Sequence, residues 1–266
     1  AHERITDAKI AEILDEIESN DDIDAITMAN IRLAREEYDR ATKLPTEFVE
    51  EMAKHRSKAL ISWTEAREKD DFSIFRDDLE IAIGHARTKA DFFGYDRLRY
   101  DALLDLYESG LTVERLDPLF SGLRENVAPL IKEIVERDEV PDLSWVTEKT
   151  WSQKAQEELS HSVSKAIGFD FAAGRRDLST HPFCGGPNPD DVRWTTRYNE
   201  EEPFGSLFGS MHETGHGTYE QGRPRYLDFQ LAGKANGLGI HESQSRLWEN
   251  QIGRSREFCE WSLPLW

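Results

Sequence analysis

The chain has 266 residues, enough for one large domain or two small ones, and 38% of them are hydrophobic. Its 52 acidic and 33 basic residues give a formal net charge of -19, which argues against nucleic acid or an anionic membrane as a partner. Such an acidic balance suits solubility in high salt. Either the source is therefore a salt-tolerant organism, or the chain is an ordinary acidic helical protein.

Cysteine content and hydropathy bear on the compartment. The two cysteines, Cys184 and Cys259, are too few for a disulfide framework, which favours a reducing, cytoplasmic location. No stretch approaches the roughly 20 apolar residues of a spanning helix, so no membrane association is expected. The chain opens at Ala1 without a methionine and stops in an apolar run at Trp266, so we expect a fragment of a longer chain.

Apolar residues recur three and four apart along the first part of the chain, with charges between them. This spacing is typical of amphipathic helices, and Ile10, Ile13 and Ile17 form one apolar stripe. A second helix should stop near Pro45, because the residue before a proline disfavours helical conformation. Further helices are predicted, in chain order, over residues 46–69, 74–93, 101–108, 113–137 and 151–167.

Glycine, proline and aromatic residues then become dense, and the helical period is lost until about residue 203. Residues 191–198 alternate instead, with Val192 and Trp194 on one face, which predicts a short strand. We expect this strand to pair with the region 181–183.

Helical spacing returns from residue 204 and again over residues 239–252. The predicted fold class is therefore mainly α, a multi-helix protein with a small β-sheet beside the last two helices.

The segment from Met211 to His216 contains the pattern HExxH. Residues four apart lie on one face of a helix, so the imidazoles of His212 and His216 can point at one ion, while Glu213 reaches a water on that ion. Zinc with three protein ligands and an open position supports hydrolysis of a carbonyl compound, with the glutamate as general base. The sequence therefore predicts a zinc peptidase site.

A third zinc ligand is expected from the later helix, where His241 and Glu242 are adjacent. Neighbours on a helix point about 100° apart, so only one of them can easily face the ion. A carboxylate from a following helix is the arrangement of thermolysin-like enzymes, so we choose Glu242. Gly215, inside the motif, weakens its helix and suggests that the ligand helix approaches closely there.

Four ordered motifs carry a resemblance to a known family: HPF at 181–183, DVRWT at 191–195, HETGH at 212–216 and HESQ at 241–244. In this order they resemble the signatures of the carboxypeptidase Taq family of zinc metallocarboxypeptidases. Similarity extends to three further segments, residues 63–67, 100–104 and 245–250.

The resemblance implies a gluzincin-like fold, with His212, His216 and Glu242 as zinc ligands and Glu213 as base. It further implies removal of single residues from peptide C-termini, and a homodimer. Family members are roughly twice as long and carry later signatures that are absent here, so the chain is expected to be an internal fragment. We expect residues 1–167 to form the wall or lid of the cleft, and 168–266 the zinc-binding catalytic region of one continuous domain.

Recognition of a free carboxylate suits arginine, whose planar fork donates two parallel hydrogen bonds. Arg193 and Arg197 lie on the polar face of the predicted strand, and either could serve. Alternatively, Arg193 pairs with Asp191 or with an acidic residue on a helix to fix the sheet. His181 could donate to the substrate carbonyl, or only cap a turn. His241 is assigned to substrate binding.

Two acidic residues, Glu220 and Glu249, are spaced to accept a hydrogen bond from a ligand imidazole, although ordinary surface charge is the preferred interpretation. Four other histidines have no partner at ligand spacing and are expected to be exposed: His2, His55, His85 and His161.

Other functions remain open. An endopeptidase or dipeptidase would share the zinc chemistry, and a non-catalytic helical scaffold would hold a structural ion without an open position. Cobalt accepts the same ligands as zinc.

Overall fold

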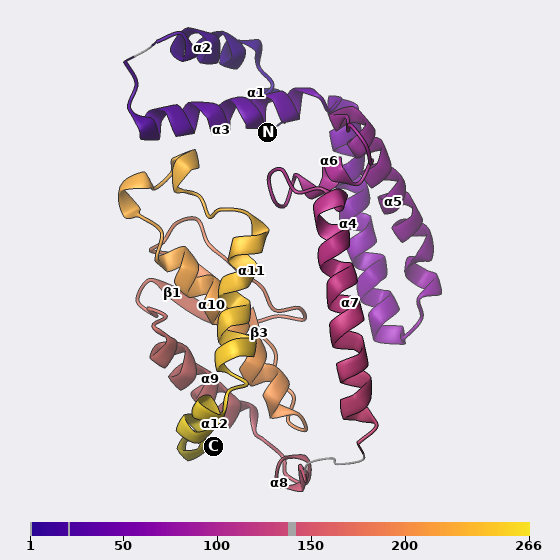
Figure 1. Ribbon diagram of the computed structural model, residues 1–266, viewed down its shortest axis with the longest axis vertical. Coiled ribbons are helices and arrows are strands. Elements are labelled where there is room, and N and C mark those ends of the chain that lie inside the picture. Colours follow the sequence, from indigo (N-terminus) through magenta and orange to yellow (C-terminus); the bar gives the residue numbers. More distant parts are fainter. Residues whose placement is uncertain (1, 21, 138–141) are drawn as a thin grey trace. The chain divides into compact units, whose positions relative to one another are not determined.

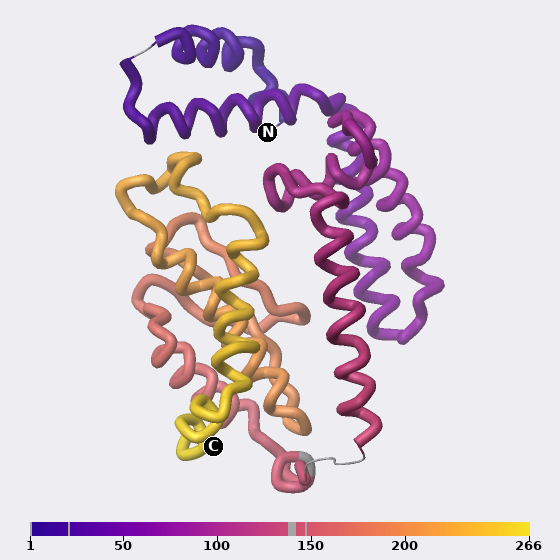
Figure 2. The backbone as a smooth tube through the Cα atoms, in the orientation of Figure 1, coloured from indigo at the N-terminus to yellow at the C-terminus, as the bar shows by residue number. Residues whose placement is uncertain are grey.

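A computed structural model describes residues 2–20, 22–137 and 142–266, with the backbone alone at Thr147, and Figures 1 and 2 trace its course. The chain forms two compact units, residues 1–126 and 127–266, which are described separately. It is mainly α-helical with one small sheet. No helix in these described stretches is long and apolar enough to cross a membrane. The predicted division of roles between residues 1–167 and 168–266 stays a prediction.

The first unit is built of helices alone within its described residues, and its last helix, α7, ends in the second unit. Its helices are α1 (His2–Ile5), α2 (Ala8–Glu18), α3 (Ala25–Thr42), α4 (Thr46–Lys69), α5 (Ser73–Phe93), α6 (Asp101–Leu104) and α7 (Val113–Val135). The side chain of Asp24 caps α3 by accepting from the backbone N–H groups of Ile26 and Thr27. Helix α3 stops before Pro45 and α4 begins directly after it, as predicted.

Helix α6 is shorter than the predicted 101–108. The Asp105 carboxylate accepts a hydrogen bond from the backbone N–H of Gly110, and Gly110 has a positive φ of 75°. The side chain thus stabilises a turn that competes with continued helix, as aspartate often does. The predicted exposure of three histidines is also wrong, since His2, His55 and His85 are partly buried. His161 is exposed as predicted.

The second unit combines helices with the sheet. After the end of α7 its elements are α8 (Ser144–Thr147), α9 (Gln153–Ile167), β1 (Gly174–Leu178), β2 (Cys184–Gly185), β3 (Val192–Thr196), α10 (Pro203–Gln221), α11 (Leu238–Arg246), the π-helical segment η3 (Leu247–Ile252) and α12 (Arg256–Ser262). Short 3₁₀ turns lie at η1 (Arg225–Leu227), η2 (Leu231–Gly233) and η4 (Leu263–Leu265).

Strand β3 lies in the centre of a sheet of three strands, parallel to β1 and antiparallel to β2. The predicted strand is therefore confirmed, and it pairs with Cys184 and Gly185, directly after the predicted partner region. Thr195 of β3 is buried, and its hydroxyl hydrogen-bonds with Ser179 and accepts from the backbone N–H of Phe183. These bonds hold the segment 181–183 against β3.

Helix α10 is the central element of the second unit, since it packs against α9, α11 and β3 (Figure 1). Leu207 and Met211 on α10 join a buried cluster with Val163 of α9 and Phe258 of α12. Trp194 of β3 lies in a second buried cluster. A helix enclosed on several sides is a rigid support for any side chains it carries.

Candidate metal centre

The HExxH side chains project from the middle of α10. On the buried part of this helix, Met211 and Thr214 have no exposed surface. The Thr214 hydroxyl donates to the backbone carbonyl of Ser210 at 2.6 Å and lies 2.7 Å from the Ser164 hydroxyl on α9. The helix is therefore fixed where His212 and His216 leave it.

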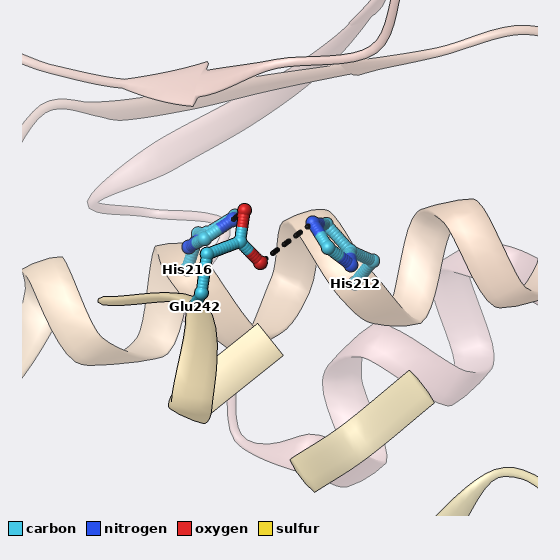
Figure 3. Close-up of side chains that lie close together, drawn as sticks. All are labelled: His212, His216 and Glu242. Atoms are coloured by element: carbon cyan, nitrogen blue, oxygen red, sulfur yellow. Dashed lines mark ion pairs between the residues drawn. The ribbon is translucent and has the colours of Figure 1, made fainter. Parts of the chain in front are cut away.

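A carboxylate from α11 meets both imidazoles (Figure 3). The Nε2 atom of His212 lies 3.6 Å from one carboxylate oxygen of Glu242, and Nε2 of His216 lies 3.9 Å from the other. The possible ligand atoms of these three residues all lie within 4.8 Å of one another. No other group of three His, Cys, Asp or Glu residues in the described chain converges in this way. The structure thus brings together the three residues predicted as ligands.

Gly215 permits this approach of α11. A Cβ atom at Gly215 would lie 2.7 Å from both the carbonyl oxygen of Gln244 and the Cα atom of Ser245. Both are backbone atoms, so α11 would have to move, and the predicted close approach is confirmed. The buried Ser245 hydroxyl lies 2.8 Å from the Glu242 carboxylate and donates to it, which orients the predicted ligand.

The other ring nitrogen of His212 is held by Glu249. The distance from His212 Nδ1 to Glu249 Oε2 is 2.9 Å, and Arg246 and Arg254 each lie 3.4 Å from the same carboxylate. Glu249 has only 16% of its side chain exposed, so its interpretation as ordinary surface charge is wrong. It lies in the π-helical segment η3, a conformation often found at functional sites.

The other ring nitrogen of His216 meets a second histidine. His216 Nδ1 lies 2.6 Å from His241 Nδ1, and His241 Nε2 lies 2.8 Å from the Glu220 carboxylate. Burial acts to raise the pKa of Glu220, but the hydrogen bond from His241 and the charge of Arg223 outweigh it and lower this pKa. Glu220, like Glu249, is thus a partly buried partner of a histidine and not ordinary surface charge.

Glu213 is buried beside the three possible ligands. The residue is 6% exposed, and its Oε2 atom has no hydrogen-bond partner among the described residues. Burial raises the pKa of Glu213 to about 7, and the neighbouring charge of Glu242 adds to the effect. Burial also lowers the pKa of His216 to about 4, so this imidazole is neutral, the form that binds metals.

A cavity of about 690 Å³ opens beside these groups. Its wall includes the three possible ligands and Glu213, and it also includes His181, Arg197, His241, Glu249 and Arg254. Its volume is in the usual range of small-molecule binding sites.

Comparison with known proteins identifies the family. A model of the carboxypeptidase Taq (M32) metallopeptidase family matches residues 1–266. The chain belongs to this family. Over 254 residues it is 39% identical to carboxypeptidase 1 of Bacillus subtilis, covering 95% of this chain and 50% of the relative. Over 276 residues it is 38% identical to thermostable carboxypeptidase 1 of Thermus thermophilus, covering 99% and 54%.

A solved carboxypeptidase of Pyrococcus furiosus shares the fold, with a TM-score of 0.90 and 33% identity, covering 99% of this chain and 53% of that one. The M32 chain described here therefore spans about half the length of the relatives it matches. The family description, a metallopeptidase, implies a metal ion as cofactor.

The arginines of this M32 chain differ in their surroundings. Arg193 donates two hydrogen bonds of 2.7 Å to Asp191, with more than half of its side chain exposed, so the structure favours the sheet-fixing alternative. Arg197 lines the cavity and donates to the carbonyl of Thr180. Arg254 also lines the cavity but was not predicted, because its ion pair with Glu249 spans five residues, a separation that ordinary helical spacing does not suggest.

Proposed function

We propose that the protein containing this chain is a zinc-dependent metallocarboxypeptidase that removes single residues from peptide C-termini. The observation that carries the proposal is the convergence of His212, His216 and Glu242 on one point in the wall of a cavity. Membership of a metallopeptidase family supports it.

The residues present fit a zinc ion. Two imidazole nitrogens and one carboxylate oxygen are the donor set of catalytic zinc sites that keep an open position. In each ligand histidine Nδ1 contacts another side chain, so Nε2, on the side of Glu242, is left for a metal. Cobalt would accept the same donors. When bound, such an ion lowers the pKa of water towards about 7 and polarises the peptide carbonyl.

Glu213 is the proposed general base. Its buried carboxylate has an oxygen without another partner in the described structure, so it can accept a proton from the attacking water and pass it to the leaving amine. His181, on the same cavity wall, is the proposed donor to the carbonyl oxygen as negative charge develops there.

Arg197 and Arg254 are the proposed partners of the substrate's terminal carboxylate. Both line the cavity, and a guanidinium matches a carboxylate with two parallel hydrogen bonds. Arg193 is the weaker candidate because Asp191 already occupies its guanidinium. Homodimer formation and a cytoplasmic location stay predictions.

The kind of peptidase can be tested on the zinc-loaded full-length protein. We expect a peptide with a free C-terminus to lose one residue at a time, and the same peptide with an amidated C-terminus to remain intact, because no carboxylate is left for the arginines. Products are identified by mass spectrometry. Internal cleavage, or equal cleavage of both peptides, would establish an endopeptidase instead. Bound zinc with no hydrolysis of either peptide would favour the scaffold.

A further inference from the structure

Beyond the candidate ligands, a line of four partly buried side chains runs back from His216. His216 contacts His241, His241 contacts Glu220, and the Glu220 carboxylate lies 2.7 Å from Nε of Arg223. Between 13% and 15% of each of these side chains is exposed. The line therefore lies largely out of water, where hydrogen bonds between side chains are strongest.

The line ends on the loop that leads to α11, which Figure 1 shows between α10 and α11. Arg223 donates from its guanidinium to the carbonyl of Gly233 at 2.7 Å. Residue 233 has to be small, because a Cβ atom there would lie 2.2 Å from the carbonyl oxygen of Leu227. Arg223, just after the end of α10, thus contacts the loop that leads to α11, the helix that carries His241 and Glu242.

The two candidate ligand histidines are held differently. His212 has a carboxylate partner, Glu249, the common arrangement for a metal-binding imidazole. The partner of His216 is instead the imidazole of His241. The Glu220 carboxylate contacts the other nitrogen of that imidazole and does not contact His216 directly.

The proposed function assigns Nε2 of His216 to the metal. This assignment fixes which atom donates in the hydrogen bonds from His216 to His241 and from His241 to Glu220. The hydrogen of the neutral His216 ring is then on Nδ1 and is donated to Nδ1 of His241. His241 must therefore carry its own hydrogen on Nε2 and donate it to Glu220. Both nitrogens of His241 are used, so neither remains for a metal or a substrate.

We propose that His241 is a positioning residue that fixes the ring of His216 for metal binding, and that Glu220 and Arg223 hold His241 in the required tautomer. This replaces the substrate-binding role predicted for His241. Because His241 and Glu242 are neighbours on α11, one helix supplies both a ligand and the partner of another ligand. Movement of α11 would weaken both together.

The test is the zinc affinity of His241 variants of the full-length protein, measured by competition with a chelator. His241→Leu, which removes the acceptor, is expected to weaken zinc binding about 10–100-fold, the usual effect of losing a ligand's partner. His241→Asn places an amide oxygen near the position of Nδ1 and is expected to restore most of the affinity. His161→Leu, which removes an exposed histidine from α9, is the matched control and should bind zinc as the unmodified protein does.

Peptide hydrolysis at saturating zinc provides the second measurement. With zinc supplied in excess, the KM of His241→Leu should be unchanged, because His241 does not touch the peptide. Unchanged zinc affinity with a raised KM would overturn the proposal and return His241 to the substrate site. Equal loss of zinc affinity in the Leu and Asn variants would also overturn it, since His241 would then act as a ligand itself.

The experiments distinguish failure of the proposed role of His241 from failure of the proposed function. If the unmodified protein binds zinc but hydrolyses no peptide, the function fails, and the affinity series still tests His241. If His241→Leu does not fold, as judged by circular dichroism, the same comparison is made between His241→Ala and His241→Asn.

Discussion

Replacing Glu213 with glutamine is expected to lower the rate of peptide hydrolysis about 10²–10⁴-fold while leaving zinc content unchanged. Glutamine keeps the size of the side chain but cannot accept a proton from water, and general-base catalysis contributes an acceleration of this order. The Glu213 side chain is not among the three converging groups, so the metal should be retained. Initial rates and the metal content of the same samples measure the two quantities.

A matched control comes from α9, where Glu158 has 70% of its side chain exposed. Glu158→Gln removes one carboxylate from the same unit and should leave the rate unchanged. Full hydrolysis by the Glu213 variant with its zinc retained would assign proton transfer to another group. Simultaneous loss of zinc and activity would show that Glu213 supports the site structurally.

Replacing Glu242 with alanine is expected to weaken zinc binding by more than about 100-fold. Loss of a partner behind a ligand already costs 10–100-fold, and loss of a ligand itself should cost more. The two imidazoles would remain, held by Glu249 and His241, so weak binding should persist. Chelator competition measures the affinity.

Glu158→Ala is the control for this variant and should bind zinc normally, because its carboxylate is exposed and pairs with Lys154 at 3.8 Å. Thermal melting of the metal-free proteins establishes that each variant folds. Normal zinc affinity in Glu242→Ala would place the third ligand elsewhere, and His241, the rival on the same helix, would be the first to examine.

Much of the fold follows from local patterns in the sequence. The apolar spacing predicted α4, α5 and α9 within about two residues, because each helix has charged residues between its apolar positions and a proline, glycine or capping residue near its ends. The alternation around Trp194 predicted β3. Strand β1 was not predicted, because its sequence, GRRDL, is polar and mostly exposed, and its strand conformation depends on pairing with β3.

Some features of the candidate site were likewise predicted from local sequence patterns, and others were not. The convergence of His212 and His216 follows from helical spacing. Side-chain direction allows only one of His241 and Glu242 to face the ion, and Glu242 was chosen because a carboxylate from a following helix is the third ligand in thermolysin-like sites. The contact between His216 and His241 joins residues 25 apart and depends on how two helices pack, which no local pattern specifies. Arg254 was missed because it reaches Glu249 from just after a π-helical segment.

The most direct test of the account is a crystal of the full-length protein grown with zinc and measured at the zinc absorption edge. The account predicts one anomalous peak, about 2.0–2.2 Å from Nε2 of His212, Nε2 of His216 and a carboxylate oxygen of Glu242, with a remaining position open to water. A peak bound by His241 in place of Glu242, or an ion fully enclosed by four protein ligands, would contradict it.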